Sequence, residues 1–143
     1  FDRKWLVPMA EALRGLGAVA AMIVHGEDGL DEITTTGVSY VAELTPDGEI
    51  REYEITPEDA GLRRAALDDL KGGEPEENAQ AIRDLLKGAQ GPYRDIVLIN
   101  AAAALKLAGL AEDLKTGAEL AGAAIDDGRA QAALDALVTA SNA

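Results

Sequence analysis

The acidic loop at residues 25–32 carries the side chains best suited to chemistry. It reads HGEDGLDE and directly follows a short apolar run. Asp31 and Glu32 are adjacent carboxylates near glycines, and such a pair suits Mg²⁺, which takes one or two protein carboxylates and completes its octahedral shell with water and phosphate oxygens. The spacing makes Asp31 and Glu32 a candidate magnesium site. The alternative is a solvated acidic turn.

Two other residues of this loop receive no catalytic role. His25 is the only histidine in the chain, and a lone histidine at the end of a strand is more often a hydrogen-bonded structural residue than a catalyst. Asp28 lies in the same loop, and its spacing to Asp31 lacks the alternating ligands and terminal Glu of a calcium-binding EF-hand loop.

Several familiar site patterns are missing from the sequence. The chain has no cysteine, so it has no thiolate nucleophile, disulfide or Cys-ligated zinc, and one histidine cannot make a multi-histidine metal site. Neither a GxxxxGK[ST] phosphate loop nor a GxGxxG motif that opens a helix occurs, and no serine sits in a GxSxG elbow. These absences leave the acidic pair as the strongest site candidate.

The charge balance excludes further classes of protein. The 143 residues include 13 Lys and Arg against 26 Asp and Glu, a formal net charge of −13. So acidic a chain repels a nucleic-acid backbone, and a divalent cation would be needed to hold an anionic phosphate ligand. The longest apolar run, residues 19–24, is far shorter than the roughly 18 residues of a membrane span. We expect a cytoplasmic protein with no nucleic-acid or membrane partner.

The elements that position the acidic loop begin with a strand. The run Val19–Val24 is continuously apolar, which is typical of a strand buried on both faces at the centre of a sheet. In an open α/β sheet, ligands bind beyond the carboxyl ends of the strands, where the acidic loop begins. Two further runs, Ser39–Leu44 and Ile50–Ile55, flank Pro-Asp-Gly in the turn 45–49 and predict a β-hairpin.

Helical patterns account for most of the remaining chain. They are predicted over residues 2–16, in a brief turn after Thr56, around Ala79–Leu86, over Ile96–Leu107, from Asp113 or Thr116 to Asp127, and in a last segment ending near Ser141. We expect the helices around Ile82 and at Ile96–Leu107 to pack against the sheet. The sequence thus predicts one α/β domain over residues 1–143: an open sheet with a buried central strand, a β-hairpin and several carboxy-terminal helices.

Four segments of the chain together resemble the carboxy-terminal part of the anthranilate phosphoribosyltransferases. They are VHGEDGLDEI at 24–33, IREY at 50–53 with TPEDAGL at 56–62, LKGGEPEENA at 70–79, and LINAAAAL at 98–105. Their order and spacing match along essentially the whole chain. The resemblance implies an enzyme that joins anthranilate to phosphoribosyl pyrophosphate and releases pyrophosphate, a step of tryptophan biosynthesis.

The resemblance also implies which parts of such an enzyme this chain contains. It implies a partial phosphoribosyltransferase-type α/β domain, with the amino-terminal helical domain and the substrate-holding loops lying before Phe1. Asp31 and Glu32 match the acidic pair that binds Mg²⁺ on the pyrophosphate side of the substrate, whereas no catalytic or substrate-binding residue of the family falls within these residues. We therefore expect the full-length enzyme to be a homodimer and the chain alone to be inactive.

Two other classes of function stay open at this stage. One is a related phosphoribosyltransferase-fold protein with a different acceptor, for which an intact Asp31–Glu32 pair would mean retained metal chemistry. The other is a non-enzymatic helical interaction module, suggested by the alanine-rich segment that starts at Asn100.

Overall fold

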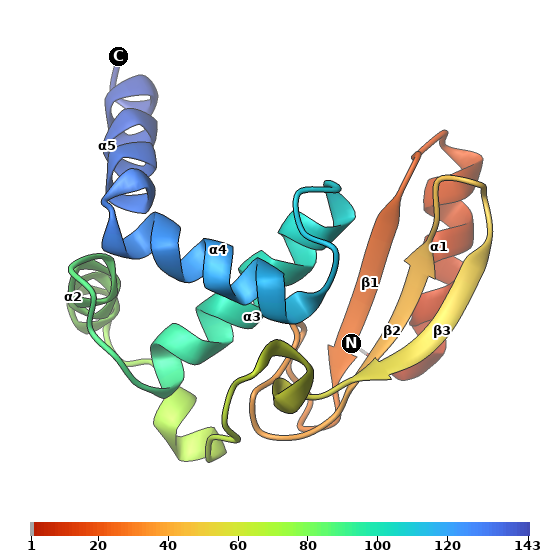
Figure 1. Ribbon diagram of the computed structural model, residues 1–143, viewed down its shortest axis with the longest axis horizontal. Helices are drawn as coiled ribbons and strands as arrows, with labels where there is room; N and C mark the ends of the chain where they lie inside the picture. The colour runs from red at the N-terminus through yellow and green to blue at the C-terminus, as the bar shows by residue number, and fades with distance from the viewer. Residues whose placement is uncertain (1) are drawn as a thin grey trace.

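The computed structural model describes residues 2–143 and shows a three-stranded antiparallel sheet with helices around it (Figure 1). The strands are β1 (Ala21–Gly26), β2 (Ser39–Leu44) and β3 (Ile50–Ile55), in the spatial order β1-β2-β3. The α-helices are α1 (Leu6–Gly15), α2 (Pro75–Leu86), α3 (Pro92–Leu107), α4 (Leu114–Asp126) and α5 (Arg129–Ser141), and short 3₁₀ turns occupy η1 (Arg3–Trp5), η2 (Pro57–Ala60) and η3 (Leu67–Leu70). The predicted α/β class is confirmed.

The hairpin has the strand bounds that the sequence predicts. Leu44 pairs with Ile50 and Ser39 pairs with Ile55, so β2 and β3 align along their whole length. In the turn, the Gly48 amide donates to the Thr45 carbonyl at 2.9 Å, and Gly48 has a φ of 85°. Glycine adopts this left-handed conformation without steric cost, which explains why Pro-Asp-Gly is a usable signal for the turn.

The first strand differs from its prediction in position. β1 begins at Ala21, two residues after the predicted start, and Val19 is 72% exposed. Within residues 2–143, β1 pairs only with β2 and is an edge strand, so the expected central strand buried on both faces is wrong for this chain. Its apolar run has the composition of an interior strand, although one long edge of β1 has no strand beside it among the described residues.

The two faces of the sheet are covered by different helices. α1 packs on one face, where Leu6 and Ala10 bury Ile23 and Ala42. α1 tolerates Pro8 because proline lies in its first turn, where the backbone N–H has no intrahelical partner. Asp2 caps η1 rather than α1, through a hydrogen bond from the Lys4 amide. The opposite face belongs to a larger apolar cluster that includes α3 and α4.

α3 and α4 form the centre of the helical half. Asp113 caps α4 by accepting a hydrogen bond from the Thr116 amide at 2.7 Å, and Gly117 lets the α4 backbone approach Ala102 of α3. A Cβ at Gly117 would lie 2.8 Å from the Ala102 Cα and 2.9 Å from its carbonyl oxygen. The close packing of the two helices therefore depends on a residue without a side chain.

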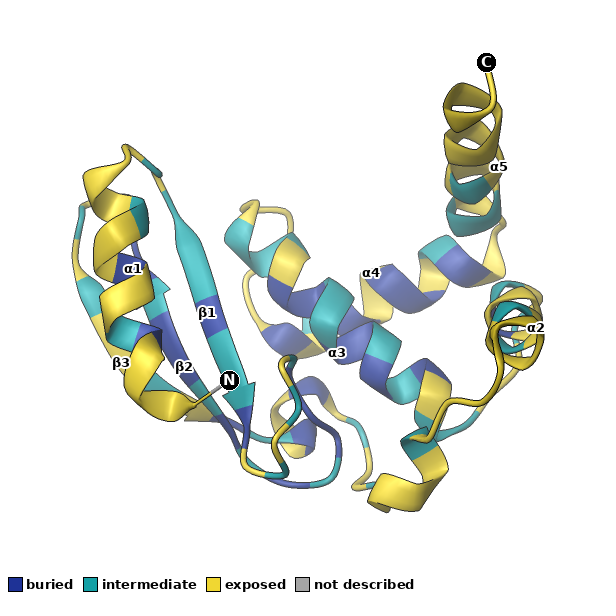
Figure 2. Ribbon diagram, turned by 180° about the vertical axis from the view of Figure 1, so that it is seen from behind, coloured by how far each residue is buried: buried dark blue, intermediate teal, exposed yellow. Residues whose placement is uncertain are grey.

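The outer helices contribute little to the core. α2 packs on α4 rather than on the sheet, and Ile82 is 42% exposed, so the expectation that this helix covers the sheet is wrong. α5 buries none of its residues and extends away from α4 (Figure 2). None of the helices within residues 2–143 combines the length and apolar character needed to cross a membrane.

We expect Gly117→Ala to lower the free energy of unfolding by about 1–3 kcal/mol, the usual cost of forcing extra atoms into a packed core. The clash is with backbone atoms, which cannot rotate away. Urea unfolding followed by circular dichroism measures the change. Gly15→Ala is the control: it has open space around it in α1 and should be neutral or slightly stabilising. Equal midpoints for Gly117→Ala and the unchanged chain would contradict the prediction.

Candidate metal site in the β1–β2 loop

The loop at residues 27–38 lies at one end of the sheet, beyond the ends of its strands. Because both strand pairs are antiparallel, the end of β1, the start of β2 and the end of β3 meet there: Gly26 pairs with Ser39, and Ser39 pairs with Ile55. The loop folds back on itself, since the Gly26 amide donates to the Leu30 carbonyl at 2.9 Å. The acidic residues thus follow the carboxyl end of β1, as predicted.

Asp28 organises the first half of this loop. Its Oδ2 accepts hydrogen bonds from the hydroxyls of Thr34 and Thr36, both at 2.6 Å, and its Oδ1 accepts from the Leu30 amide at 3.1 Å. A Cβ at Gly26 would lie 2.5 Å from Oδ1, so glycine is required for Asp28 to reach this position. Both carboxylate oxygens are engaged, and Asp28 is therefore a structural residue of the loop.

These hydrogen bonds also set the acidity of Asp28. Burial alone would raise the pKa of its carboxyl, but the hydrogen bonds from Thr34, Thr36 and Leu30 favour the charged form and lower the pKa below its usual value. A carboxylate stabilised in this way contributes to folding only while it is ionised.

The second half of the loop is held by α3. Asn100 Oδ1 accepts a hydrogen bond from the Ile33 amide at 2.9 Å, and Asn100 Nδ2 donates to the Ile33 carbonyl at 2.8 Å. The same Nδ2 lies 2.9 Å from the Ile96 carbonyl and 3.1 Å from Oε2 of Glu32. One side chain of the helix thus contacts both the backbone and an acidic side chain of the loop.

The acidic pair lies between these two attachments. A site that awaits a metal ion is expected to have exposed carboxylates. Asp31 is exposed, whereas Glu32 is partly buried, so the expectation holds only for Asp31. Neither forms an ion pair with a Lys or Arg within residues 2–143. Burial raises the pKa of Glu32, and the charges of Asp31 and Asp28 raise it further. A positive charge at the pair would relieve this repulsion.

The carboxylates of Asp31 and Glu32 suit a hard divalent cation whose other ligands come from a substrate and from water. Within residues 2–143, no three His, Asp or Glu side chains converge to hold a metal ion by themselves. Mg²⁺ needs only one or two protein carboxylates when phosphate oxygens and water supply the other positions. Asp31 also borders a hollow of about 400 Å³ lined by α1 and β1, which leaves its carboxylate accessible.

His25 lies outside the acidic pair, and Asn100 is a residue of the site that the sequence did not predict. In β1, His25 lies on the same face as Ile23, the face that α1 covers. Asn100 is absent from the predicted site residues. The signal available was a single amide side chain inside the apolar run Ile96–Leu107, because a polar group in such a helix must find hydrogen-bond partners.

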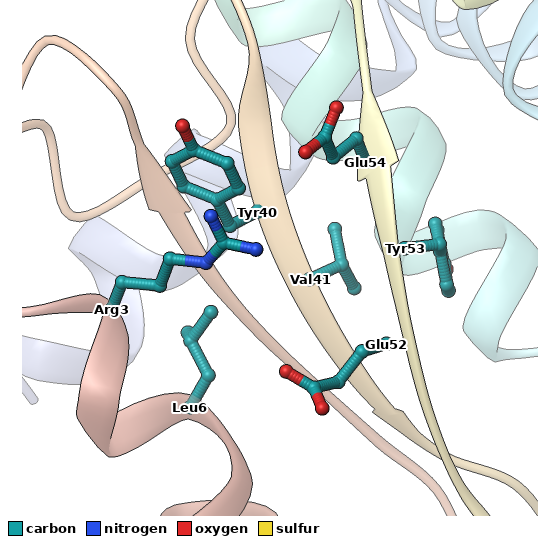
Figure 3. A pocket seen from close by; sticks show the side chains of 7 residues that line it. All are labelled: Arg3, Leu6, Tyr40, Val41, Glu52, Tyr53 and Glu54. Atoms are coloured by element: carbon teal, nitrogen blue, oxygen red, sulfur yellow. The ribbon is translucent and has the colours of Figure 1, made fainter.

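Another hollow, of about 360 Å³, lies over β2 and β3 (Figure 3). Arg3 stacks over the Tyr40 ring, 3.7 Å from its centroid, and Glu52 and Glu54 project from β3 beside it. The acidic residues are exposed and the one cation already contacts the aromatic ring. This hollow contains no residue of the 27–38 loop and offers no comparable site.

The sequence and fold place this chain in a known family. Residues 1–131 match the family described as "Glycosyl transferase family, a/b domain", and the chain belongs to that family. Its relatives include the anthranilate phosphoribosyltransferases of Methylocella silvestris and Parvibaculum lavamentivorans, 58% and 60% identical over 142 residues. Those alignments cover 99% of this chain but only 40% and 41% of the relatives, so the chain spans about two fifths of their length.

Solved structures show the same similarity. The anthranilate phosphoribosyltransferase of Thermus thermophilus has a TM-score of 0.86 and 45% identity, over 97% of this chain and 40% of that one. The enzyme of Saccharomyces cerevisiae, in complex with PRPP and Mg, has a TM-score of 0.85 and 25% identity, over 94% of this chain and 39% of that one. The resemblance seen in the four sequence segments is confirmed.

We expect Asp28→Asn to destabilise the chain by about 1–3 kcal/mol at pH 7, because hydrogen bonds to a charged acceptor are lost. The folded-state pKa of Asp28 is lowered, so its contribution is complete above the unfolded pKa and disappears as the pH falls through the folded pKa. The difference between the variant and the unchanged chain should therefore shrink as the pH falls below the ordinary carboxyl pKa of aspartate.

Urea unfolding at a series of pH values measures this effect. Asp135→Asn, which removes an exposed carboxylate of α5, is the matched control and should stay within about 0.5 kcal/mol of the unchanged chain at pH 7. A constant difference between Asp28→Asn and the unchanged chain at all pH values would show that the charge of Asp28 is not what stabilises the loop.

Proposed function

We propose that this chain is the carboxy-terminal section of the catalytic α/β domain of an anthranilate phosphoribosyltransferase. The complete enzyme would transfer phosphoribosyl from phosphoribosyl pyrophosphate to anthranilate, release pyrophosphate, and act in tryptophan biosynthesis as a cytoplasmic homodimer. The observation that carries the proposal is the 58–60% identity to enzymes of this name along 99% of the chain. Identity at this level favours anthranilate over a different acceptor.

The surface around β1 supports the proposal that further chain completes the domain. Among residues 2–143, β1 has no strand beside one of its edges, and hollows of about 400 and 220 Å³ lie on its two faces. Met22 and Val24 border both hollows, and Val19 and Met9 are exposed nearby. An interior strand with open grooves on both sides is what remains when a neighbouring strand is absent, and the relatives have the additional length to supply one.

In the proposed enzyme, Asp31 and Glu32 hold Mg²⁺ on the pyrophosphate side of the substrate. Phosphoribosyl transfer moves negative charge onto the departing pyrophosphate while the ribose acquires oxocarbenium character. Mg²⁺, when bound, supplies positive charge that stabilises the departing oxygens. Asp31 and Glu32 act as anchors and exchange no proton with the substrate. Their lack of Lys or Arg partners among the described residues supports this role.

The first test of the proposal removes the charge of the acidic pair. We would replace the matched 142 residues of the Parvibaculum lavamentivorans relative with this chain. In this assembled enzyme, Asp31→Asn with Glu32→Gln should lower kcat/KM by about 100-fold and raise the Mg²⁺ concentration for half-maximal rate, because metal anchors of this kind supply several kcal/mol of charge stabilisation. Steady-state kinetics across a Mg²⁺ titration measures both effects.

The control is a charge change away from the loop. Glu112→Gln with Glu119→Gln neutralises two exposed carboxylates, one just before α4 and one within it, and should leave the kinetics unchanged. Unchanged kinetics for the Asp31/Glu32 variant across the titration would show that the pair is a solvated turn and not a metal site.

A second test concerns the chain alone. We expect the 143-residue chain to convert no measurable anthranilate, because the proposed substrate-holding segments belong to the section that the relatives have in addition. Loss of anthranilate fluorescence in the presence of PRPP and Mg²⁺ is the measurement, with the assembled enzyme as the positive control. Product formation by the chain alone would overturn the proposed division of the enzyme.

A further inference from the structure

Asn100 occupies a position where both polar ends of its side-chain amide must be hydrogen-bonded. Its neighbours in α3 are apolar, and Ile99, Ala102 and Ala103 are buried. A buried or partly buried polar group costs free energy unless it is hydrogen-bonded. Asn100 satisfies both ends of its amide on the main chain of one loop residue: Oδ1 accepts from the Ile33 amide and Nδ2 donates to the Ile33 carbonyl.

The remaining contacts of Asn100 show how strongly its amide binds the carboxylate of Glu32. Nδ2 has two hydrogens but three acceptors within reach: the carbonyls of Ile33 at 2.8 Å and Ile96 at 2.9 Å, and Oε2 of Glu32 at 3.1 Å. The backbone carbonyls are the nearer partners, so Glu32 receives the longest and least favoured contact. Its carboxylate is oriented by the amide while most of its lone pairs stay available.

Ile33 transmits this constraint to the acidic pair. Its side chain is 1% exposed and belongs to the main apolar cluster, so the residue is fixed on one side by packing and on the other by the Asn100 amide. Glu32 and Asp31 precede it directly. Fixing the peptide on the carboxyl side of Glu32 limits the directions that its carboxylate can take.

We propose that Asn100 is a positioning residue for the acidic pair: its amide fixes the main chain at Ile33 and so holds Glu32 and Asp31 in the arrangement that binds a divalent cation. This inference rests on the proposed metal role of the pair. It assigns to α3 a part in cation binding, although no side chain of α3 is proposed as a ligand.

The test measures cation affinity on the chain itself, with Mn²⁺ as the probe in place of Mg²⁺. Paramagnetic broadening of the Asp31 and Glu32 amide signals reports binding without any need for activity. Asn100→Ala should weaken Mn²⁺ binding by about 10–100-fold, the usual effect of removing a residue that orients a metal ligand. The Ile33 amide should also exchange with deuterium faster in this variant.

Two further variants separate positioning from general stability. Ile99→Val trims a buried neighbour on the same helix and makes no polar contact with the loop, so its Mn²⁺ affinity should stay within about twofold of the unchanged chain even though stability falls. Asn100→Asp keeps the acceptor for the Ile33 amide but turns a carboxylate oxygen toward two carbonyls and Glu32. It should therefore fail to restore the binding that Asn100→Ala loses.

The outcomes of these variants are decisive. Weakened binding in Asn100→Ala with unchanged binding in Ile99→Val supports the proposal. Equal Mn²⁺ affinity in Asn100→Ala and the unchanged chain overturns it, as does an equal loss in Asn100→Ala and Ile99→Val. Tighter binding in Asn100→Asp would also overturn it, since Asn100 would then be a vacant ligand position and not a positioning group.

Kinetics of the assembled enzyme distinguish this inference from the proposed function. There, Asn100→Ala should raise the Mg²⁺ requirement and the KM for PRPP about tenfold, while the KM for anthranilate changes less than about twofold. If the assembled enzyme shows no activity but Mn²⁺ binding still depends on Asn100, the proposed function fails and the positioning role stands.

Discussion

The site depends on the hydrogen bonds that pair the main-chain polar groups of the loop at residues 27–38. The loop has no helix or strand of its own, yet Ile33, Thr34 and Thr35 are almost completely buried. Buried main-chain polar groups must be paired, and a loop in this position cannot rely on water. Side chains supply the partners instead: Asp28 at its beginning and Asn100 from α3 near its middle. The acidic pair is held in place because the residues on either side of it are fixed.

α3 serves both halves of the molecule. Toward the sheet it presents Asn100, which holds the loop, and toward α4 it presents Ala102, against which Gly117 packs. At its amino-terminal end the buried Arg94 pairs with Asp126 of α4 at 2.9 Å. Removing Asp126 would leave the buried Arg94 charge without its partner, so the orientation of the two helices is fixed by charge at one end and by close backbone packing at the centre.

The sequence predicted the bounds of the helices and strands more reliably than which of them lie side by side. Local signals determine a hairpin turn or a helix cap, so the bounds of β2 and β3 were correct, and Asp113, one of two candidate caps, caps α4. Whether β1 is central depends on which strands lie beside it, and its composition reflects an interior strand that the described residues do not complete. The acidic pair was recognisable as two adjacent carboxylates. An amide inside an apolar helix indicates that Asn100 needs hydrogen-bond partners, but it does not identify them. The partner, Ile33, is distant in the chain and is bound through its backbone.

The contact between Ile33 and Asn100 also has a consequence for the order of folding. It joins residues 67 positions apart, whereas the hairpin and the α3–α4 pair are built from contacts between neighbouring elements. Closing so long a loop costs chain entropy that is recovered only when the sheet and the helices have docked. The acidic pair is therefore arranged at the end of folding. A chain that has its strands and helices but has not docked them would keep its secondary structure and lack the arrangement of Asp31 and Glu32 that we propose binds a cation. Under that proposal, cation affinity, and not helix content, would be the measure of a completed fold.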